Sequence, residues 1–570
     1  MKNIKLKNSL LVCIFLSLFG FAYAGGNKHG QQKSDYARVT EDGKAAVATV
    51  NPYATQAAIN AIKKGGNAVD AALAAAFTLG VVDSHNSGVG GGCFILAHLA
   101  NGQIIALDGR EMAPGKAHRM MYMRNGKVEK NLSRTGALAS GIPGSVQAFY
   151  EIQKKAGKLN FSDVLLPAAA IAEKGFNMDK TMAMRLNRVS DRMQQFPASA
   201  AIYLDKNKMP LKEGDLLVQK DLAKSYRALA KHGPKWFYRG DFAEATAKWM
   251  KENGGIITQK DFANYRTIYR EPVKSEYKGH TIYGFPPPSS GGAHVAQVLN
   301  ILSNVELSKL KDHERYHYLI EAMKLAFADR AHWLGDADFV KVPKGIIKQN
   351  YADSLFKKIN AKKAAGIIEP GTPPLSAEDL FNKHTTHIAT ADADGNWVAI
   401  TTTLNTSFGS KVVVPGTGIL LNNQMDDFAA PNNQPNAFGL VGAEANAVEA
   451  RKRPLSSMSP TLVVKNGKPV MTLGAAGGPT IITQVIQSLV YKLALNKPLE
   501  QAVDSIRVHQ QWKPASVFVE KRMPEATRKE LEKLGHQLRT AGDFGGTQAI
   551  AFENGRFIAV TEPRVIRRNQ

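Results

Sequence analysis

The amino-acid sequence predicts an α+β fold in which sheets are covered by helices. Long helical patterns occupy most of the first two thirds of the chain, and short strands rich in Val, Ile and Thr alternate with turns in the last third. Of the 570 residues, 44% are hydrophobic, which is enough for a large core. Helices and hairpins that each bury one face pack stably as layers. We therefore expect helices stacked on sheets.

Near the N-terminus, the pattern predicts two helices followed by a hairpin. Residues 56–64 form a helical stretch that ends at the stop signal Gly65-Gly66. Residues 67–82 are Ala-rich and apolar on every side, which indicates a buried helix. A strand at 94–97, an Asn-Gly turn and a strand at 104–107 then form a hairpin. The polar stretch 25–40 is expected to be disordered.

The remaining chain changes from helices to hairpins near residue 384. Residues 145–265 have amphipathic helical spacing, a Pro-, Ser- and Gly-rich loop follows at 280–292, and more helix is expected up to about residue 365. Three hairpins are predicted later in the chain, at 387–404, 461–474 and 547–560. The last helices are expected at 481–495, 499–504 and 524–534.

The first 24 residues have the pattern of an export signal. Three lysines precede an apolar run at 10–21, and Ala22-Tyr23-Ala24 provides a small-x-small cleavage pattern. The apolar run is shorter than the roughly 20 residues that span a bilayer, and no later segment has the required length and apolarity. We expect a signal peptide at 1–24 and an exported protein, periplasmic or secreted, without a transmembrane segment.

Charge and ligand patterns exclude several classes of function. The formal net charge is +24, but Lys and Arg are scattered and form no basic-aromatic stripe typical of nucleic-acid binders. The Gly-rich run at 88–92 lacks the ending of a phosphate-binding loop, and Asp392-x-Asp394-Gly395 lacks the spacing of a calcium loop. His384 and His387 would point to opposite faces of a strand. We expect no nucleic-acid partner, no cofactor and no metal ion.

Several motifs rich in Thr, Ser, Asn and Gly follow one another in a characteristic order. Taken singly, each is ordinary strand or turn sequence. Taken together, they resemble the γ-glutamyltransferase family over nearly the whole mature chain, and NNQMDDF followed by RPLSSMSP is the most specific pair. The motifs are GGNAVDAA (65–72), SGVGGGCF (87–94), DGREMAP (108–114), PPPSSGG (286–292), TTH (385–387), TTTLNTSFG (401–409), NNQMDDF (422–428), RPLSSMSP (453–460) and GAAGGP (474–479).

The resemblance implies a four-layer αββα sandwich of the N-terminal nucleophile hydrolase type. Members are made as one chain that cleaves itself before the Thr of the TTH motif, here between His384 and Thr385. A large subunit, 25–384, and a small catalytic subunit, 385–570, would then form one intertwined heterodimer. The implied activity is transfer of the γ-glutamyl group of glutathione and related compounds to water, an amino acid or a peptide.

A terminal Thr suits this chemistry. A hydroxyl is a poor nucleophile without a base, but an N-terminal amine has a pKa of roughly 7.7 to 8.0 and can take the hydroxyl proton. Thr385 would be nucleophile and base together, and the uncut chain would be inactive. By resemblance, Thr403 hydrogen-bonds the amine, while Gly477 and Gly478 present N–H groups to the oxyanion.

A γ-glutamyl group carries an α-carboxylate and an α-ammonium, and each needs a complementary charge. Arg110 offers a fork-shaped cation for the carboxylate, and the resemblance adds Ser456 and Ser457 as its helpers. Asp427 offers a negative charge for the ammonium. The resemblance adds two supports for the ammonium site, Asn405 and Gln424.

Two alternative functions stay open. Acylases of glutaryl-cephalosporins and a capsule-anchoring relative share this fold and the terminal Thr but differ in the substrate pocket. The presence here of Arg110, Asp427, Ser456 and Ser457 favours a γ-glutamyl donor. The second alternative, of another class, is an inactive surface protein whose basic face holds polyanions. Such a protein would run as one band on a gel, whereas the enzyme would run as two.

The loop between Asp427 and Arg453 is long enough to be the lid that many family members place over the pocket. In several bacterial relatives this lid carries a Tyr whose hydroxyl bonds the residue that matches Asn405. Phe438 stands at that place here, and it has no donor. We expect a lid that closes by packing alone and opens more readily.

Overall fold

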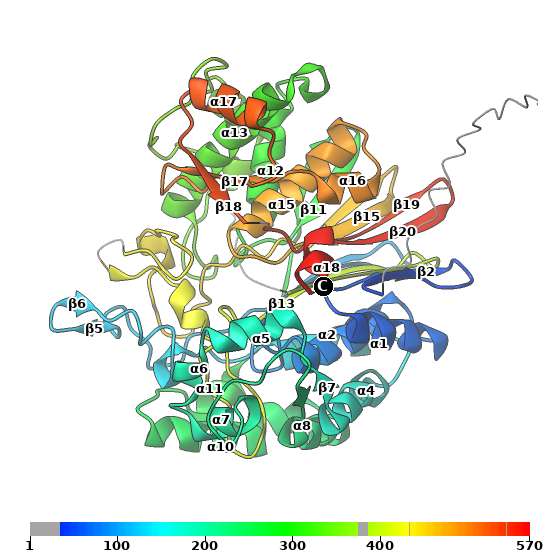
Figure 1. Cartoon of the computed structure of the whole chain (residues 1–570), viewed down its shortest axis with the longest axis vertical. Coiled ribbons are helices and arrows are strands. Elements are labelled where there is room, and N and C mark those ends of the chain that lie inside the picture. Colours follow the sequence, from blue (N-terminus) through cyan, green and yellow to red (C-terminus); the bar gives the residue numbers. More distant parts are fainter. Residues whose placement is uncertain (1–34, 374–385, 432–433, 543, 570) are drawn as a thin grey trace, which may run out of the picture. The chain divides into compact units, whose positions relative to one another are not determined.

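Two antiparallel sheets lie face to face, and helices cover the outer face of each (Figure 1). The computed structural model describes residues 35–373, 386–431, 434–542 and 544–569. The first sheet has seven strands in the order β1 (Ala37–Val39), β2 (Ala45–Ala48), β12 (Thr386–Asp392), β13 (Trp397–Thr403), β3 (Gly92–His98), β4 (Ile104–Gly109) and β9 (Ile268–Arg270). The second has six, in the order β10 (Val273–Tyr277), β11 (His280–Gly284), β14 (Thr461–Lys465), β15 (Lys468–Gly474), β19 (Gln548–Glu553) and β20 (Arg556–Thr561). The predicted α+β layers are confirmed.

Alternation along the strands determines which side chains enter each layer. Ile388, Val398 and Ile400 pack with the first helical layer, whereas Ala389 and Ala399 pack between the two sheets. Successive side chains of a strand point to opposite faces. Strands β12 and β13 therefore place branched residues under the helices, and Ala389, Ala399 and Trp397 where the sheets meet.

The first helical layer comes from the N-terminal half of the chain. Its long central helix, α2, begins at a capping box: the Asn67 side chain accepts from the N–H groups of Val69 and Asp70, and the Asp70 carboxylate accepts from the Asn67 N–H. Every residue of α2 is buried, as its all-apolar pattern predicts. The helices are α1 (Pro52–Lys63), α2 (Ala68–Val82), α3 (Ser145–Ala156), α4 (Phe161–Lys174), α5 (Lys180–Asn187), α6 (Ser190–Met193), α7 (Pro197–Tyr203), α8 (Lys220–His232), α9 (Pro234–Arg239), α10 (Asp241–Glu252) and α11 (Gln259–Asn264).

The second helical layer covers the six-stranded sheet. The helix expected at 481–495 begins as α15 and ends in a π-helical turn, Val490–Ala494. The helices of this half are α12 (Gly291–Leu302), α13 (Asp312–Trp333), α14 (Gln349–Phe356), α15 (Thr480–Leu489), α16 (Leu499–Asp504) and α17 (Glu525–Lys533), and α18 (Pro563–Asn569) ends the described chain. Smaller sheets pair β5 (Met123–Arg124) with β6 (Lys127–Val128), β7 (Phe176–Asn177) with β8 (Leu216–Leu217), and β16 (Val508–His509) with β17 (Val517–Glu520) and β18 (Leu538–Ala541).

Both sheets mix strands from before and after residue 385. Strands β12 and β13 lie between β2 and β3, and β14 pairs with β11. The predicted hairpins are confirmed as β3–β4, β12–β13, β14–β15 and β19–β20. Within the described ranges, no helix has the length and apolarity needed to cross a bilayer.

Two expectations about local structure were wrong. Residues 37–39 were expected to be disordered, yet they form edge strand β1, because their backbone pairs with β2 and this pairing outweighs the polar local sequence. The hairpin of β10 and β11 was not expected, because no element was predicted for 266–279 and a loop was predicted from residue 280. It forms because β11 pairs with β14, almost two hundred residues later, which no local pattern reveals.

Candidate active site

The sequence motifs converge at one end of the two sheets. In the first sheet, β13 ends at Thr403, which pairs with Gly92 at the start of β3, and β12 begins at Thr386, which pairs with Thr402. The second sheet meets the same end, because the ring of His387 on β12 packs against Gly474 at the end of β15. A Cβ on that glycine would lie 2.4 Å from the ring. Loops that follow β4, β13 and β15 are therefore brought together.

Arg110 and Asp427 are in direct contact. The Arg110 Nη2 group donates to Asp427 Oδ2 at 2.6 Å, and both side chains are buried. The same guanidinium donates from Nη1 to Glu111 Oε2 and from Nε to the Pro454 carbonyl, each at 3.3 Å. One cation thus joins the end of β4 to the loop of Asp427 and to the segment before Ser456. The sequence assigned these two charges to two groups on the same α-carbon of the substrate, and the structure pairs the two side chains with each other.

Glu111 adds a second carboxyl to this cluster. Burial raises its pKa to about 7, the Arg110 charge acts in the opposite direction, and the Asp427 charge adds to the rise. A Cβ on Gly92 would lie 2.5 Å from Glu111 Oε2, so only a glycine at the start of β3 leaves room for this carboxyl. Near neutral pH the cluster can therefore gain or lose one proton at Glu111.

Three of the predicted substrate-binding side chains have buried polar atoms without a partner. Among the described residues, nothing bonds to Asn405 Oδ1, to either amide atom of Gln424 or to the hydroxyl of Ser457. Asn405 is held by its Nδ2, which donates to the Asn423 carbonyl at 2.9 Å, and by its own N–H, which donates to Thr403 Oγ1 at 2.7 Å. A buried polar atom without a bond costs about 1–3 kcal/mol. Several such atoms at one place are typical of a site that binds a polar ligand.

The serines of the RPLSSMSP motif are also placed by the surrounding loops. Ser456 Oγ accepts from the Met458 N–H at 3.3 Å, and its carbonyl accepts from Ser290 Oγ at 2.8 Å. Asn446 links this segment to the Asp427 loop, because it donates to the Asp427 carbonyl and accepts from the Leu455 N–H. The structure thus brings Ser456 and Ser457 to the same loop cluster as Arg110 and Asp427.

Gly477 and Gly478 lie immediately before helix α15. Their φ angles are 126° and 67°, which favour glycine. Thr480 Oγ1 donates to the Gly477 carbonyl at 2.6 Å, and the Ile481 N–H donates to the Gly478 carbonyl. Within the described chain, the N–H groups of the two glycines have no acceptor. Free N–H groups at the start of a helix are suited to stabilise a negative charge.

The start of β12 is held by a buried carboxyl. Thr386 Oγ1 donates to Asp83 Oδ2 at 2.9 Å, and Asn86 Nδ2 donates to the other oxygen at 2.9 Å. Burial raises the pKa of Asp83 to about 7. His387 bonds through Nδ1 to Thr401 Oγ1 at 2.9 Å, and burial lowers its pKa to about 3, so its ring is neutral. Thr385 and the bond between 384 and 385 lie outside the described residues.

Phe438 lies on the loop after Asp427, the segment for which the sequence predicts a lid. It is half-buried and packs against the core of the second helical layer. Its carbonyl accepts from Gln511 Nε2 at 3.3 Å, and its N–H donates to Asn436 Oδ1. The expected role of Phe438 in closing the pocket stays a prediction.

One cluster in the described part of the chain has the composition of a metal site, His317, Glu321 and His536. His317 Nδ1 lies 2.8 Å from His536 Nε2, and the other His317 nitrogen bonds the Asn360 carbonyl. Lys324 Nζ donates to Glu321 at 2.7 Å, so the carboxylate already has a counter-ion. The three side chains therefore bond to one another and to their neighbours Asn360 and Lys324.

Sequence reasoning missed three charged residues near the site, Glu111, Asp83 and Arg330. Glu111 lies inside a quoted motif, and its position beside Arg110 was the available signal. Asp83 follows the buried helix α2, and Arg330 lies on α13, far along the chain from the loops it meets. No spacing in the sequence connects either residue to the site.

Known proteins resemble this chain over most of its length. A profile of the family described as gamma-glutamyltranspeptidase matches residues 54–569. The glutathione hydrolase proenzyme of Escherichia coli (strain K12) is 42% identical over 528 residues, which cover 91% of this chain and 90% of that protein. The Acylase ACY 1 proenzyme of Pseudomonas sp. (strain SE83) is 35% identical over 520 residues, covering 89% of each. The crystal structure of cephalosporin acylase from Bacillus halodurans has a TM-score of 0.83 at 29% identity, covering 91% of this chain and 94% of that one. The match over nearly the full length, together with the converging motifs, shows that this chain belongs to the gamma-glutamyltranspeptidase family.

Proposed function

We propose that this enzyme cleaves the γ-glutamyl amide of glutathione and related compounds, and passes the glutamyl group to water, an amino acid or a peptide. The observation that carries the proposal is the loop cluster at the end of the two sheets. It holds an Arg and an Asp in contact, beside buried polar atoms that lack partners among the described residues. A γ-glutamyl group supplies the matching charges and hydrogen bonds.

Binding of the donor requires the buried ion pair to exchange partners. The α-carboxylate binds Arg110 and the hydroxyls of Ser456 and Ser457, and the α-ammonium binds Asp427. The 2.6 Å contact of Arg110 with Asp427 then opens, but each charge keeps a counter-ion. This matters because breaking a buried pair without replacement is strongly destabilising.

The oxygens and amides around the ammonium complete its site. A bound ammonium has three protons to donate, and one is taken by Asp427. Asn405 Oδ1 and Gln424 Oε1 are two buried acceptors without partners in the described chain, and they lie on loops tied to each other through Asn423. Their orphaned atoms therefore support a cationic group at this place.

The chemical step is acyl transfer to a terminal hydroxyl. The α-amine of Thr385 takes the proton of its own Oγ, which attacks the γ-carbonyl carbon of the donor. The N–H groups of Gly477 and Gly478 stabilise the oxyanion, and the amine part of the donor leaves with a proton. Water or an acceptor amine then attacks the γ-glutamyl ester. Thr403, at the end of β13, is the proposed partner of the Thr385 amine.

The amine of Thr385 exists only after the chain is cut, so the chain is proposed to be a precursor that cleaves itself between 384 and 385. The order β2-β12-β13-β3 supports a stable pair of fragments, because strands of 385–570 lie between strands of 25–384. The signal peptide at 1–24, and hence export to the periplasm or the medium, stays a prediction from the sequence.

The test combines processing with activity. Purified wild type should give two bands, and the smaller should begin Thr-Thr-His by N-terminal sequencing. Thr385→Ala should stay one intact chain without activity on γ-glutamyl-p-nitroanilide, because it lacks the hydroxyl. A cut elsewhere, or efficient cutting of the Ala variant, would remove Thr385 from this role.

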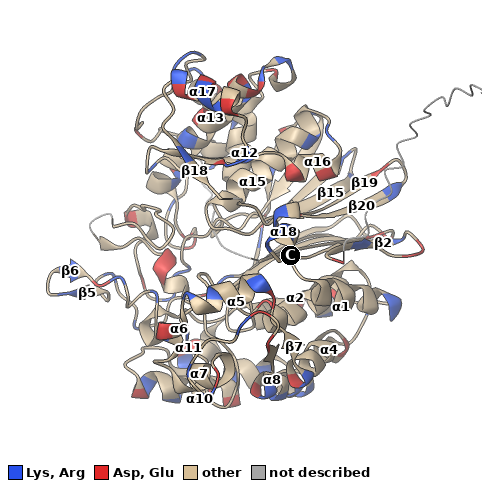
Figure 2. Ribbon diagram, in the orientation of Figure 1, with Lys and Arg blue, Asp and Glu red and all other residues tan. Residues whose placement is uncertain are grey.

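The acylase alternative shares the fold and has a named relative of similar length. A glutaryl group lacks the ammonium, so it gives Asp427 no cation to bind. The buried carboxylate therefore favours the γ-glutamyl donor. The polyanion alternative has less support, because Lys and Arg are spread over both helical layers with Asp and Glu among them (Figure 2).

A further inference from the structure

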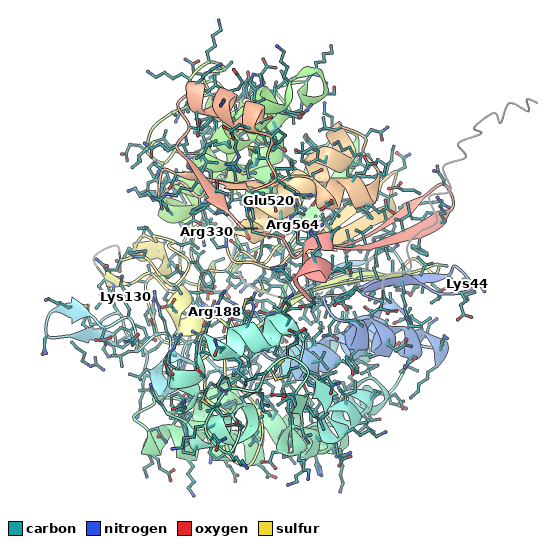
Figure 3. The ribbon with its side chains drawn as sticks, viewed as in Figure 1. Lys44, Lys130, Arg188, Arg330, Glu520 and Arg564 are labelled. Carbon is teal, nitrogen blue, oxygen red and sulfur yellow. The ribbon has the colours of Figure 1, made fainter. Side chains whose placement is uncertain are left out.

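Arg330 is a buried cation beside the proposed donor site. It projects from α13, is 2% exposed, and lies where that helical layer meets the middle of the molecule (Figure 3). Its Nε donates to Ser290 Oγ at 3.2 Å, and Ser290 donates in turn to the Ser456 carbonyl. Two hydrogen bonds thus connect Arg330 to the segment that carries Ser456 and Ser457.

Arg330 differs from every other buried arginine in the described chain. Four of the five have a carboxylate within ion-pair distance, whereas Arg330 has none among the described residues. The paired arginines are Arg110 with Glu111 and Asp427, Arg453 with Asp108, Arg507 with Glu562, and Arg564 with Glu520 and Glu562. Arginines are almost never fully buried without such a partner. An unpaired one beside a site is therefore a candidate for binding an anion.

The net charge of the cluster favours binding of an anion. Burial lowers the pKa of Arg330 to about 9, and Asp427 is the carboxylate whose charge counteracts this shift. Asp427, however, is already in contact with Arg110 at 2.6 Å. With Arg110 and Arg330 positive, Asp427 negative and Glu111 protonated, these four groups carry one positive charge in excess. A bound ligand carboxylate would neutralise it.

We propose that Arg330, on α13, supplies a second positive charge for the α-carboxylate of the donor. This role rests on the proposed function, since it concerns the same donor. In this proposal two arginines interact with the carboxylate of the donor. Arg110 binds the carboxylate directly, and Arg330 compensates its charge from beside the Ser290–Ser456 segment.

A purely structural role for Arg330 makes a different prediction. If the guanidinium only ties α13 to Ser290, its loss would disturb every substrate equally. If its charge serves the carboxylate, its loss would matter only for substrates that have one. Three p-nitroanilides separate the cases: γ-glutamyl has both charged groups, glutaryl lacks the ammonium, and 4-aminobutanoyl lacks the carboxylate.

The experiment compares Arg330→Gln, Arg330→Lys and Ser290→Ala, with Arg315→Gln as a charge-loss control on the same helix. In Arg330→Gln we expect kcat/KM to fall about ten- to hundredfold for the γ-glutamyl and glutaryl compounds, and less than about threefold for 4-aminobutanoyl. Arg330→Lys keeps the charge and should recover most of the loss. Ser290→Ala keeps the charge too, so it should preserve the preference for a carboxylate, as should Arg315→Gln.

Equal losses for the three compounds, or a Lys variant as impaired as the Gln variant, would overturn the proposal. Binding of L-glutamate and 4-aminobutyrate, followed by the shift of Tm, gives a readout that needs no turnover. Arg330→Gln should lose the glutamate shift selectively, and retention of that shift would also overturn the proposal. A wild type that binds glutamate but cleaves no γ-glutamyl compound would instead contradict the proposed function.

Discussion

Asp427→Asn tests the central pair of charges. Asn keeps the shape of the side chain and an acceptor for Arg110, but it removes the negative charge that the substrate ammonium needs. A charge-assisted hydrogen bond contributes about 1.5–3 kcal/mol. Its loss should lower kcat/KM for γ-glutamyl-p-nitroanilide about ten- to 150-fold. Glutaryl-p-nitroanilide has no ammonium, so its kcat/KM should change by less than about threefold.

The matched control is Asp426→Asn. Asp426 is the preceding residue and is also buried, but it accepts from Ser133 Oγ at 2.6 Å and from Arg134 Nε at 3.2 Å rather than from Arg110. If Asp426→Asn only disturbs the loop, it should lower kcat/KM for γ-glutamyl-p-nitroanilide and for glutaryl-p-nitroanilide by the same factor. If Asp427→Asn also lowered the two rates by the same factor, Asp427 would not recognise the ammonium.

The same variant should change how stability depends on pH. In the wild type the pKa of Glu111 is raised to about 7, so its contribution to stability is lost as pH rises through 7. Removing the Asp427 charge lowers that pKa and lets Glu111 ionise as the counter-ion of Arg110. At pH 5.5 the variant leaves Arg110 unpaired, which costs about 3–5 kcal/mol. The deficit in Tm should be smaller at pH 8, and an equal or larger deficit there would contradict this account.

Two further predictions concern the start of β12 and the lid. The pKa of Asp83 is raised from 3.8 to about 7, so its contribution to stability is present below pH 4 and is lost as pH rises through 7, by at most about 4 kcal/mol. Asp83→Asn keeps an acceptor for Thr386 and should flatten the fall of Tm between pH 5 and 8; an unchanged slope would mean that Asp83 does not titrate there. Phe438→Tyr adds a hydroxyl for Asn405 and should add about 0.5–1.5 kcal/mol to lid closure, shifting the ratio of transfer to hydrolysis. An unchanged ratio, with unchanged proteolysis within 428–450, would show that Phe438 does not gate the site.

The layers and hairpins could be predicted because they follow local patterns. Strands β12 and β13 are rich in Val, Ile and Thr, and Asn101-Gly102 marks a turn between β3 and β4. Edge strand β1 and the hairpin of β10 and β11 were not predictable in this way. Their order comes from pairing with β2 and β14, and a short polar segment carries no sign of its future neighbour.

The sequence by itself determined the motifs, the types of charge in the site and the family that they resemble. These are properties of residues close together in the chain. The tertiary structure alone decided which charges meet. Arg110 and Asp427 are 317 positions apart, yet they lie at 2.6 Å, and Arg330 reaches the Ser456 segment through Ser290. Such contacts form when the ends of two sheets and a helix from another layer pack around the same buried site. The free energy of this packing depends on all the layers together.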